Sequence, residues 1–297
     1  MAEKKAVNKV VEPTNEEIDA HVDQLVAKAQ VALSKFEEFT QEQVDYIVAK
    51  CSVAGLDAHG TLAEAAVNET GRGVFEDKAV KNLFACEYVT SNLRHLKTVG
   101  IINEDPLLGI TEIAEPVGVV CGIVPTTNPT STVIFKSLIC LKTRNPIIFS
   151  FHPSAHACSV MAAVVIRDAA IAAGAPEDCI QWLDLKSMYA TTALMKHPGV
   201  ATILATGGNA MVAAAYSCGK PALGVGAGNV PAYVEKTCVL PRAVNDIVLS
   251  KSFDNGMICA SEQAAIVDTE IYDAFMKEIK RFKVYFVNKE EKAKLET

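Results

Sequence analysis

Aromatic residues and positive charge are both scarce in this sequence. Only 6% of the 297 residues are Phe, Trp or Tyr, and 28 Lys and Arg stand against 35 Asp and Glu, for a formal net charge of −7. Proteins that bind nucleic acid or anionic membranes usually have basic surfaces, and many add aromatic stacking platforms. We therefore expect neither nucleic acid nor membrane among the partners of this chain.

Closely spaced cysteines and uninterrupted apolar runs are missing as well. Nine cysteines are spread along the chain without a C-x-x-C pair, which disfavours a disulfide framework and a zinc cluster. Residues 1–13 are basic and have no apolar core, unlike a signal peptide. The most apolar stretch, 159–176, is interrupted by Arg167 and Asp168, well short of a membrane span. We expect a cytoplasmic protein with reduced thiols and no metal site.

The first hundred residues have the pattern of amphipathic helices. Half of the whole sequence is hydrophobic, which is typical of globular proteins, and the length allows about two domains. Two capping boxes, Thr14 with Glu17 and Thr40 with Gln43, predict the starts of two helices, and apolar residues follow at helical spacing. Residues 1–13 are expected to form a loose tail. We expect this region to contribute packing and no chemistry.

Strands and helices alternate in the next part of the chain. Short apolar runs predict five strands, at 116–124, 146–151, 179–185, 200–206 and 221–225. Helical patterns separate them, and one of these helices is expected to be capped by Ser154 and closed by Gly174. Each parallel strand needs a crossover, so the alternation predicts an α/β fold with a doubly wound parallel sheet of Rossmann type. Ligands of such folds bind at the carboxyl ends of the strands.

The pattern changes again after Asn229. Strands are predicted at 231–235 and 264–268, and helices at 241–253 and 269–282, before a charged end. These elements are too few to close a second sheet. We therefore divide the chain into N-terminal helices plus a nucleotide-binding domain, 1–230, and the start of a second, incomplete α/β domain, 231–297.

Cys259 has the most polar, loop-like surroundings of the nine cysteines. It lies between a predicted helix and a predicted strand, three residues after Gly256, which permits a tight turn. A cysteine there could present its sulfur at an edge of the fold. The alternative is a buried cysteine that acts as a small hydrophobic residue, and cysteine statistics alone favour it.

Three further motifs follow predicted strands. Pro125 and Pro129 fix the backbone around Asn128, which either presents its amide to a ligand or only caps the next helix. The glycine turn 206–208 precedes a helix and could hold a phosphate, whereas the glycines of 224–229 form only a weak dinucleotide fingerprint. His152 could reach a ribose or be an ordinary surface histidine.

Four long segments resemble the aldehyde dehydrogenase superfamily when taken together. The resemblance is closest to the N-terminal, CoA-acylating acetaldehyde dehydrogenase part of bifunctional aldehyde–alcohol dehydrogenases, the fermentative enzymes. The segments are EPVGVVCGIVPTTNPTSTVIFKSLICLKTRNPIIF, ILATGG, GKPALGVGAGN and KSFDNGMICASEQ, in that order.

The resemblance implies a role for each matching position. Cys259 matches the catalytic nucleophile, and Asn128 matches the asparagine whose amide helps to form the oxyanion hole. The residues implied to line NAD are Ile123, Val124, Pro125, Thr126, Thr127 and Asn128, with Gly208 and Gly226 against the cofactor. His152 stands where many relatives have a Lys that contacts the adenosine ribose. The domain at 1–230 is then the NAD-binding domain, and 231–297 begins the catalytic domain.

Two departures from the hydrolytic members of the superfamily favour coenzyme A as the acyl acceptor. The stretch 224–228 has no carboxylate where those relatives have a Glu that activates water, and Met257 replaces their usual Gln or Glu. Without a general base, water attacks a thioester slowly, whereas a thiol needs less help. The implied reaction interconverts acetaldehyde, CoA and NAD⁺ with acetyl-CoA and NADH. A hydrolytic NAD(P)-dependent enzyme and an inactive nucleotide-binding fragment stay open as alternatives.

The resemblance also implies what surrounds this chain in the bifunctional enzymes. Residue 297 falls inside the catalytic domain of the family, so we expect a truncated chain without the iron-dependent alcohol dehydrogenase part. The implied assembly is a homo-oligomer, and full-length relatives form filaments.

Overall fold

The N-terminal region is built from helices, as the sequence predicts. The computed structural model describes residues 13–296, so most of the predicted tail at 1–13 lies outside the described residues. The side chains of Thr14 and Thr40 accept hydrogen bonds from the backbone N–H groups of Glu17 and Gln43, which confirms both capping boxes. The helices are α1 (Asn15–Phe36), α2 (Gln41–Asp57), α3 (His59–Thr70), α4 (Phe75–Leu83) and α5 (Val89–Leu93), with a π-helical turn, Phe84–Tyr88, before α5.

A five-stranded parallel sheet follows, and it confirms the doubly wound α/β prediction. Its strands are β3 (Val119–Val124), β4 (Ile147–Phe151), β5 (Ile180–Trp182), β6 (Val200–Thr206) and β7 (Ala222–Val225), in the spatial order β5-β4-β3-β6-β7. The crossovers contain α6 (Pro129–Lys142), α7 (His156–Ala172), α8 (Met188–Lys196) and α9 (Asn209–Tyr216). This strand order is that of a Rossmann-type sheet, in which the chain reverses direction across the sheet after its third strand.

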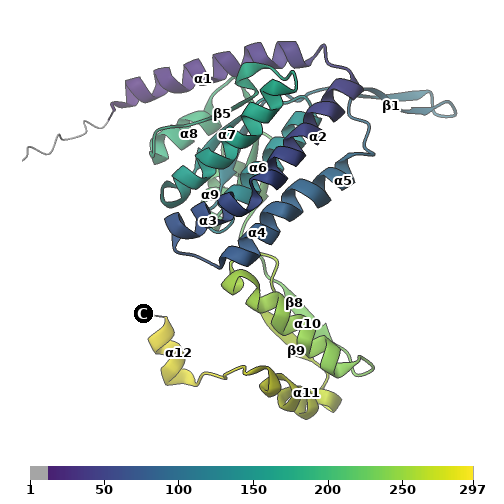
Figure 1. The fold of residues 1–297 in the computed structure, drawn as a ribbon, viewed down its shortest axis with the longest axis vertical. Coiled ribbons are helices and arrows are strands. Elements are labelled where there is room, and N and C mark those ends of the chain that lie inside the picture. Colours follow the sequence, from purple (N-terminus) through teal and green to yellow (C-terminus); the bar gives the residue numbers. More distant parts are fainter. Residues whose placement is uncertain (1–12, 297) are drawn as a thin grey trace, which may run out of the picture.

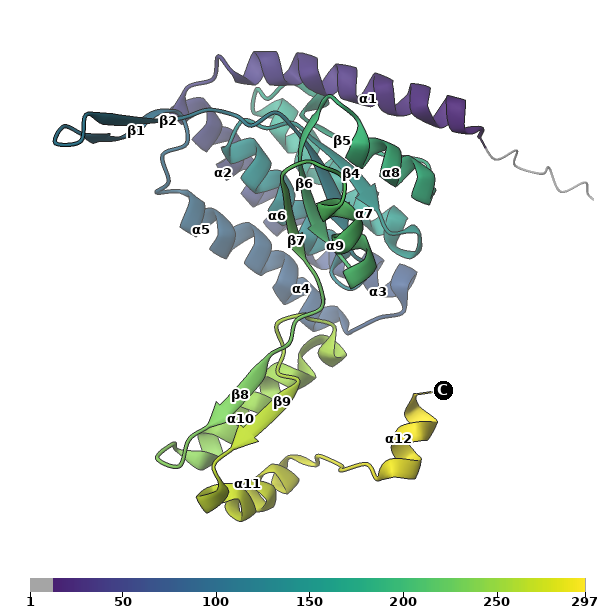
Figure 2. The same cartoon turned by 180° about the vertical axis from the view of Figure 1, so that it is seen from behind.

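Helices cover both faces of this sheet (Figures 1 and 2). Side chains of β3 alternate between the two layers, because successive residues of a strand point to opposite faces. Val120 and Val124 pack with α2, α6 and α7, whereas Val119, Cys121 and Ile123 pack with α1 and α8. Every residue of β3 and β4 is buried, which explains their nearly continuous apolar sequences.

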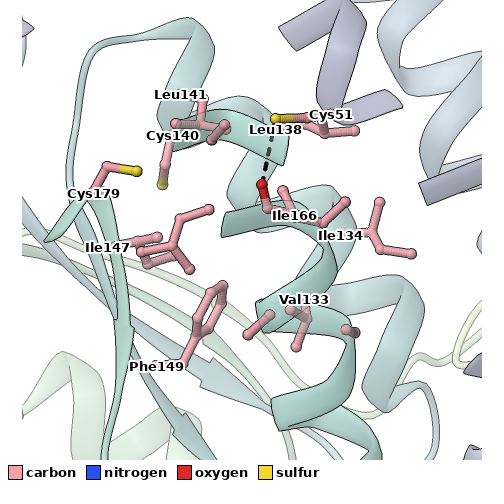
Figure 3. Packing of buried hydrophobic residues seen from close by; sticks show 14 of the residues in the cluster. Cys51, Val133, Ile134, Leu138, Cys140, Leu141, Ile147, Phe149, Ile166 and Cys179 are labelled. Carbon is pink, nitrogen blue, oxygen red and sulfur yellow. Dashed lines mark hydrogen bonds between the residues drawn. The ribbon is translucent and has the colours of Figure 1, made fainter. Parts of the chain in front are cut away.

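Phe149 of β4 lies at the centre of the larger hydrophobic core. Its side chain is fully buried among aliphatic residues of α6 and β4, including Val133 and Ile147 (Figure 3). The cysteines Cys51, Cys140 and Cys179 belong to the same cluster, and the Cys51 thiol donates a hydrogen bond to the carbonyl of Ile166. These thiols therefore serve as packing groups.

The predicted cap at Ser154 is wrong. Helix α7 begins at His156 after a 3-10 turn, Pro153–Ala155, and its first N–H groups, those of Ala157 and Cys158, donate to the carboxylate of Glu69 at 2.9 and 2.7 Å. The Ser154 hydroxyl instead hydrogen-bonds His152 and Thr126. A carboxylate from distant α3 caps this helix, and local sequence does not reveal such a partner.

A β-hairpin and a short C-terminal helix were not predicted from the sequence. Strands β1 (Gly100–Asp105) and β2 (Ile110–Ala114) pair in antiparallel orientation and project from the body of the molecule (Figures 1 and 2). Most of their side chains are exposed, so the buried-strand pattern is absent from their sequence. The charged end forms α12 (Lys289–Leu295), which begins with a capping box at Asn288.

The last part of the chain forms a separate small layer. Strand β8 (Pro231–Val234) pairs in parallel with β9 (Ala264–Val267), and α10 (Leu240–Ser252) connects them. The predicted helix over 269–282 contains α11 (Tyr272–Ile279) between two 3-10 turns, Thr269–Ile271 and Lys280–Phe282. Val234, Val244 and Phe275 form the core of this part, apart from the clusters around the five-stranded sheet.

One helical segment in residues 13–296, Pro153–Ala172, is long and apolar enough to cross a membrane by length and composition. In the structure it packs against α2 and α6. Ala162, Ile166 and Ala170 are fully buried in the core there, and 39% of the apolar window is buried.

Phe149→Ala tests the core. We expect this substitution to lower the free energy of unfolding by about 3–5 kcal/mol, because it removes a fully buried ring and leaves a cavity. Leu107→Ala, at the hairpin tip where Leu107 is 96% exposed, is the control and should change stability little. Urea unfolding followed by circular dichroism measures both, and equal costs would contradict the assigned core.

Candidate functional site

A pocket of about 510 Å³ lies at the carboxyl ends of the parallel strands. Strand β3 pairs with β4 on one side and β6 on the other, so the chain crosses over in opposite directions there, and a crevice opens outside the strand ends. All of the residues selected from the sequence line this pocket: Ile123, Val124, Pro125, Thr126, Thr127, Asn128, His152, Gly208, Gly226 and Cys259.

Lys136 of α6 connects two strands near the pocket. Its Nζ donates to the carbonyl oxygens of Ile123 and Leu204, both at 2.6 Å, and so links the ends of β3 and β6. The side chain is almost fully buried, and this desolvation lowers its pKa to about 7. Lys136 therefore connects these two strands in addition to their backbone pairing.

Cys259 follows a tight turn at the pocket wall. The 3-10 turn Phe253–Gly256 comes first, and Asp254 and Asn255 adopt left-handed backbone conformations with φ of 50° and 53°. The carbonyl oxygen of Cys259 comes so close to Gly228 that a Cβ there would lie 2.2 Å from it. Gln263 Nε2 donates to the Gly228 carbonyl at 2.6 Å, so the glycine segment after β7 and the cysteine loop fit directly together.

Burial distinguishes Cys259 from the other cysteines. Of the nine, all within residues 13–296, Cys259 is the only exposed one, and Cys218 and Cys238 are half-buried. Burial raises the pKa of five thiols to about 12 and that of Cys51 still further. The five are Cys86, Cys121, Cys140, Cys158 and Cys179. Because the thiolate is the nucleophile, these six are unsuited to attack at neutral pH.

Asn128 directly precedes α6, yet its side chain does not cap this helix. The alternative of a purely capping asparagine is therefore wrong. The Oδ1 atom accepts a hydrogen bond from Lys81 Nζ at 2.6 Å, and Nδ2 donates to Thr127 Oγ1 at 3.1 Å. The carboxamide lies in the same pocket as the Cys259 thiol.

Two buried lysines of α4 reach this region, which the sequence did not predict. Lys78 and Lys81 both form ion pairs with Asp254, a residue with no exposed surface, at 3.0 and 2.5 Å. The backbone N–H of Val74 also donates to Asp254, and Gly73, with φ of +73°, leaves room for it, because a Cβ would lie 1.9 Å from Oδ1. Lysines on a helix are usually exposed, so only the tertiary contact reveals these two.

The glycine turns and His152 complete the lining. Gly208 precedes α9, and the position where its Cβ would lie has no neighbour within 4 Å, so its surface is open. Gly226 lies close to Asn209 Oδ1, which accepts from the N–H of Ala227 at 3.3 Å. Segment 224–229 leads into β8, as expected, and not into a helix. His152 is exposed, and its Nδ1 forms hydrogen bonds with the backbone N–H and the hydroxyl of Ser154.

Comparison with known proteins identifies the family. The profile described as "Aldehyde dehydrogenase family" matches residues 3–290. This chain belongs to the aldehyde dehydrogenase family. It is 71% identical over 281 residues to aldehyde-alcohol dehydrogenase 2 of Entamoeba histolytica, a match that covers 94% of this chain and 32% of that protein. The chain thus spans about a third of the aldehyde-alcohol dehydrogenases that it matches.

Solved structures agree with the fold of this aldehyde dehydrogenase chain. An acetylating aldehyde dehydrogenase of Geobacillus thermoglucosidasius has a TM-score of 0.90 at 48% identity, covering 94% of this chain and 62% of that one. A propionaldehyde dehydrogenase of Rhodopseudomonas palustris, solved with bound CoA and an acylated cysteine, has a TM-score of 0.80 at 31% identity, covering 92% and 62%.

Carboxylates are absent from the described lining of the pocket in this chain. Residues 225–228 and Met257 contribute to the lining, and none of the lining residues is Asp or Glu. Within residues 13–296, no group of three or more His, Cys, Asp or Glu side chains could hold a metal ion.

Alkylation of the native protein should be selective for Cys259. At pH 8, a thiol with a pKa of about 12 is ionised in about one molecule in ten thousand, so the buried cysteines should not react. Iodoacetamide should therefore label Cys259 first, and peptide mass spectrometry identifies the site. After unfolding in urea all nine cysteines should react, which is the control. First labelling at a buried cysteine would contradict the structure.

Gly228→Ala tests the close contact between the glycine segment and the cysteine loop. The added Cβ overlaps the Cys259 carbonyl, so we expect the free energy of unfolding to fall by about 1–3 kcal/mol and the alkylation rate of Cys259 to change. Gly60→Ala, on α3 with no neighbour within 4 Å of the new Cβ, is the matched control and should leave that rate unchanged. An unaltered rate in Gly228→Ala would show that the loops do not touch.

Proposed function

We propose that this chain carries the cofactor pocket and the nucleophile of a CoA-acylating aldehyde dehydrogenase. The reaction interconverts acetaldehyde, CoA and NAD⁺ with acetyl-CoA and NADH. The observation that carries this proposal is a single pocket that holds the exposed Cys259 thiol and the Asn128 carboxamide but no carboxylate in its described lining.

Cys259 begins the reaction as the nucleophile. Its thiolate forms a bond from Sγ to the aldehyde carbon, and the carbonyl oxygen takes up the negative charge. Two groups are suited to hold this oxygen, the Asn128 amide and the backbone N–H of Cys259, which has no acceptor among the described residues. Preformed donors of this kind are worth about 100–1000-fold in rate each.

The cofactor fits the crevice at the ends of β3 and β6. Residues 123–128 line one wall, Gly208 offers an open backbone surface before α9, and Gly226 lies nearby. His152 follows β4 and lines the same pocket, which supports our proposal that it contacts a ribose hydroxyl. These residues would hold NAD⁺, which would supply the acceptor for the hydride lost from the substrate carbon as the thioester forms on Cys259.

Coenzyme A then takes the acyl group. Its thiolate attacks the thioester carbon, and the Cys259 sulfur leaves as a thiolate, ready for the next cycle. Hydrolysis would require a base to activate water, and no Asp or Glu lines the described pocket. A thiol ionises far more readily than water, so it needs no such base.

The proposal also covers the division of the chain into two parts and the cellular setting of the enzyme. The separate strand pair and core after residue 230 support a division into an NAD-binding part, 1–230, and the start of a catalytic part, 231–297. A fermentative role is part of this proposal and rests on the resemblance to bifunctional aldehyde–alcohol dehydrogenases. We propose a cytoplasmic enzyme that acts as a homo-oligomer, with NAD as its nicotinamide cofactor.

Cys259→Ala tests the nucleophile. In the full-length gene product, CoA-dependent NADH formation from acetaldehyde should fall by about 1000-fold or more, because removal of a covalent nucleophile costs that much in comparable sites. NADH fluorescence and chromatography of acetyl-CoA measure the effect. Cys238→Ala, a half-buried cysteine outside the pocket, is the matched control and should keep its activity.

Two outcomes would contradict the proposed function. If the wild-type protein forms NADH and acetate at full rate without CoA, the enzyme is hydrolytic. If it binds NAD but Cys259 resists alkylation and no NADH forms, it is a nucleotide-binding protein only.

A further inference from the structure

Lys81 connects the two loops that carry the proposed catalytic groups. Besides its ion pair with Asp254, its Nζ donates to Asn128 Oδ1 at 2.6 Å and to the backbone carbonyl of Met257 at 3.0 Å. One ammonium group, on a side chain that is 8% exposed, thus touches the carboxamide and the loop that carries Cys259.

Lys78 is a close counterpart with a different set of contacts. It lies one turn earlier on α4, pairs with the same Asp254 oxygen at 3.0 Å, and donates to the backbone carbonyl of Thr127 at 3.1 Å. It forms no hydrogen bond with the Asn128 side chain among the described contacts. The two lysines therefore share charge and environment but differ in their contact with the carboxamide.

The contact with Lys81 fixes which way the Asn128 amide faces. If the amide turned over, its NH₂ group would meet the ammonium group, and two donors would face each other in a buried site. The amide oxygen therefore faces Lys81, and the NH₂ group faces away from it. One of its hydrogens goes to Thr127 Oγ1, and the second has no protein acceptor among residues 13–296.

The charge of Lys81 also strengthens the amide as a donor. A hydrogen bond from an ammonium group to an amide oxygen is charge-assisted, and it polarises the amide so that its N–H groups donate more strongly. Asp254 pairs with this ammonium group, and the left-handed backbone at Asp254 and Asn255 brings its carboxylate to α4.

We propose that Lys81 is a positioning residue that acts through Asn128. It holds the carboxamide with its second N–H available to the oxygen of the reacting carbonyl. This inference rests on the proposed function, because it assigns Lys81 a part in the same oxyanion site.

A double-mutant cycle tests this inference in the full-length gene product. The variants are Lys81→Met, Asn128→Ala and the two together, with Lys78→Met as the matched control. Two rates are measured for each: the first turnover of NADH formation, which requires the oxyanion, and alkylation of Cys259 by iodoacetamide, which does not. Thermal unfolding reports the stability of each variant.

We expect Lys81→Met to slow the first turnover by about 100–1000-fold, comparable to Asn128→Ala, since both remove the same oriented donor. The double variant should be within about threefold of Asn128→Ala, because coupled residues are not additive. Alkylation should change by less than about threefold. Lys78→Met should lose similar stability but slow the first turnover far less.

Three results would overturn the positioning role. The effects of Lys81→Met and Asn128→Ala could multiply in the double variant, alkylation could fall together with the first turnover, or Lys78→Met could match Lys81→Met. If Lys81→Met does not fold, Lys81→Gln, which is neutral and shorter, enters the same cycle with the same expected coupling to Asn128. A wild-type protein without CoA-dependent NADH formation would refute the proposed function itself, whereas an active wild type with multiplying effects would refute only the role of Lys81.

Discussion

The burial of β3 on both faces sets the arrangement of the sheet and of the pocket. Because Val119 to Val124 has no exposed side, it must lie between β4 and β6 and beneath helices on both layers. The chain crosses over in opposite directions from this central position, so the strand ends leave a crevice that helices cannot fill. Lys136 holds the ends of β3 and β6 together at that point. The location of the pocket follows from the packing of one strand.

Buried charge joins this sheet to the cysteine loop. A carboxylate without exposed surface is stable only if cations and N–H groups compensate it, and Asp254 receives two lysines and a backbone N–H. The lysines come from α4, the carboxylate from the turn before Cys259, and both lysines also touch the segment after β3. Compensation of the buried Asp254 carboxylate thus brings together α4, the turn before Cys259 and the segment after β3, which are far apart in sequence.

Burial also decides which sulfur is available for chemistry. Most of the thiols lie in the cores around the sheet, where desolvation keeps them protonated, while Cys259 lies in a loop at the open pocket. The sequence contains nine cysteines of similar type, and their number and spacing do not rank them. The burial of each cysteine in the folded chain does rank them.

Local sequence signals were sufficient for the fold class and for most of the regular elements, through the capping boxes at Thr14 and Thr40 and the apolar runs that alternate with helices. Local signals alone favoured a buried Cys259 and left the role of Asn128 open, and the resemblance to the family selected the pocket residues. The exposed hairpin at β1 and β2 had no buried face to mark it, and the cap of α7 comes from Glu69 on another helix. Tertiary structure alone assigned the partners of Asn128 and Asp254, because a lysine buried against a distant carboxylate has the same local sequence as a lysine in solvent.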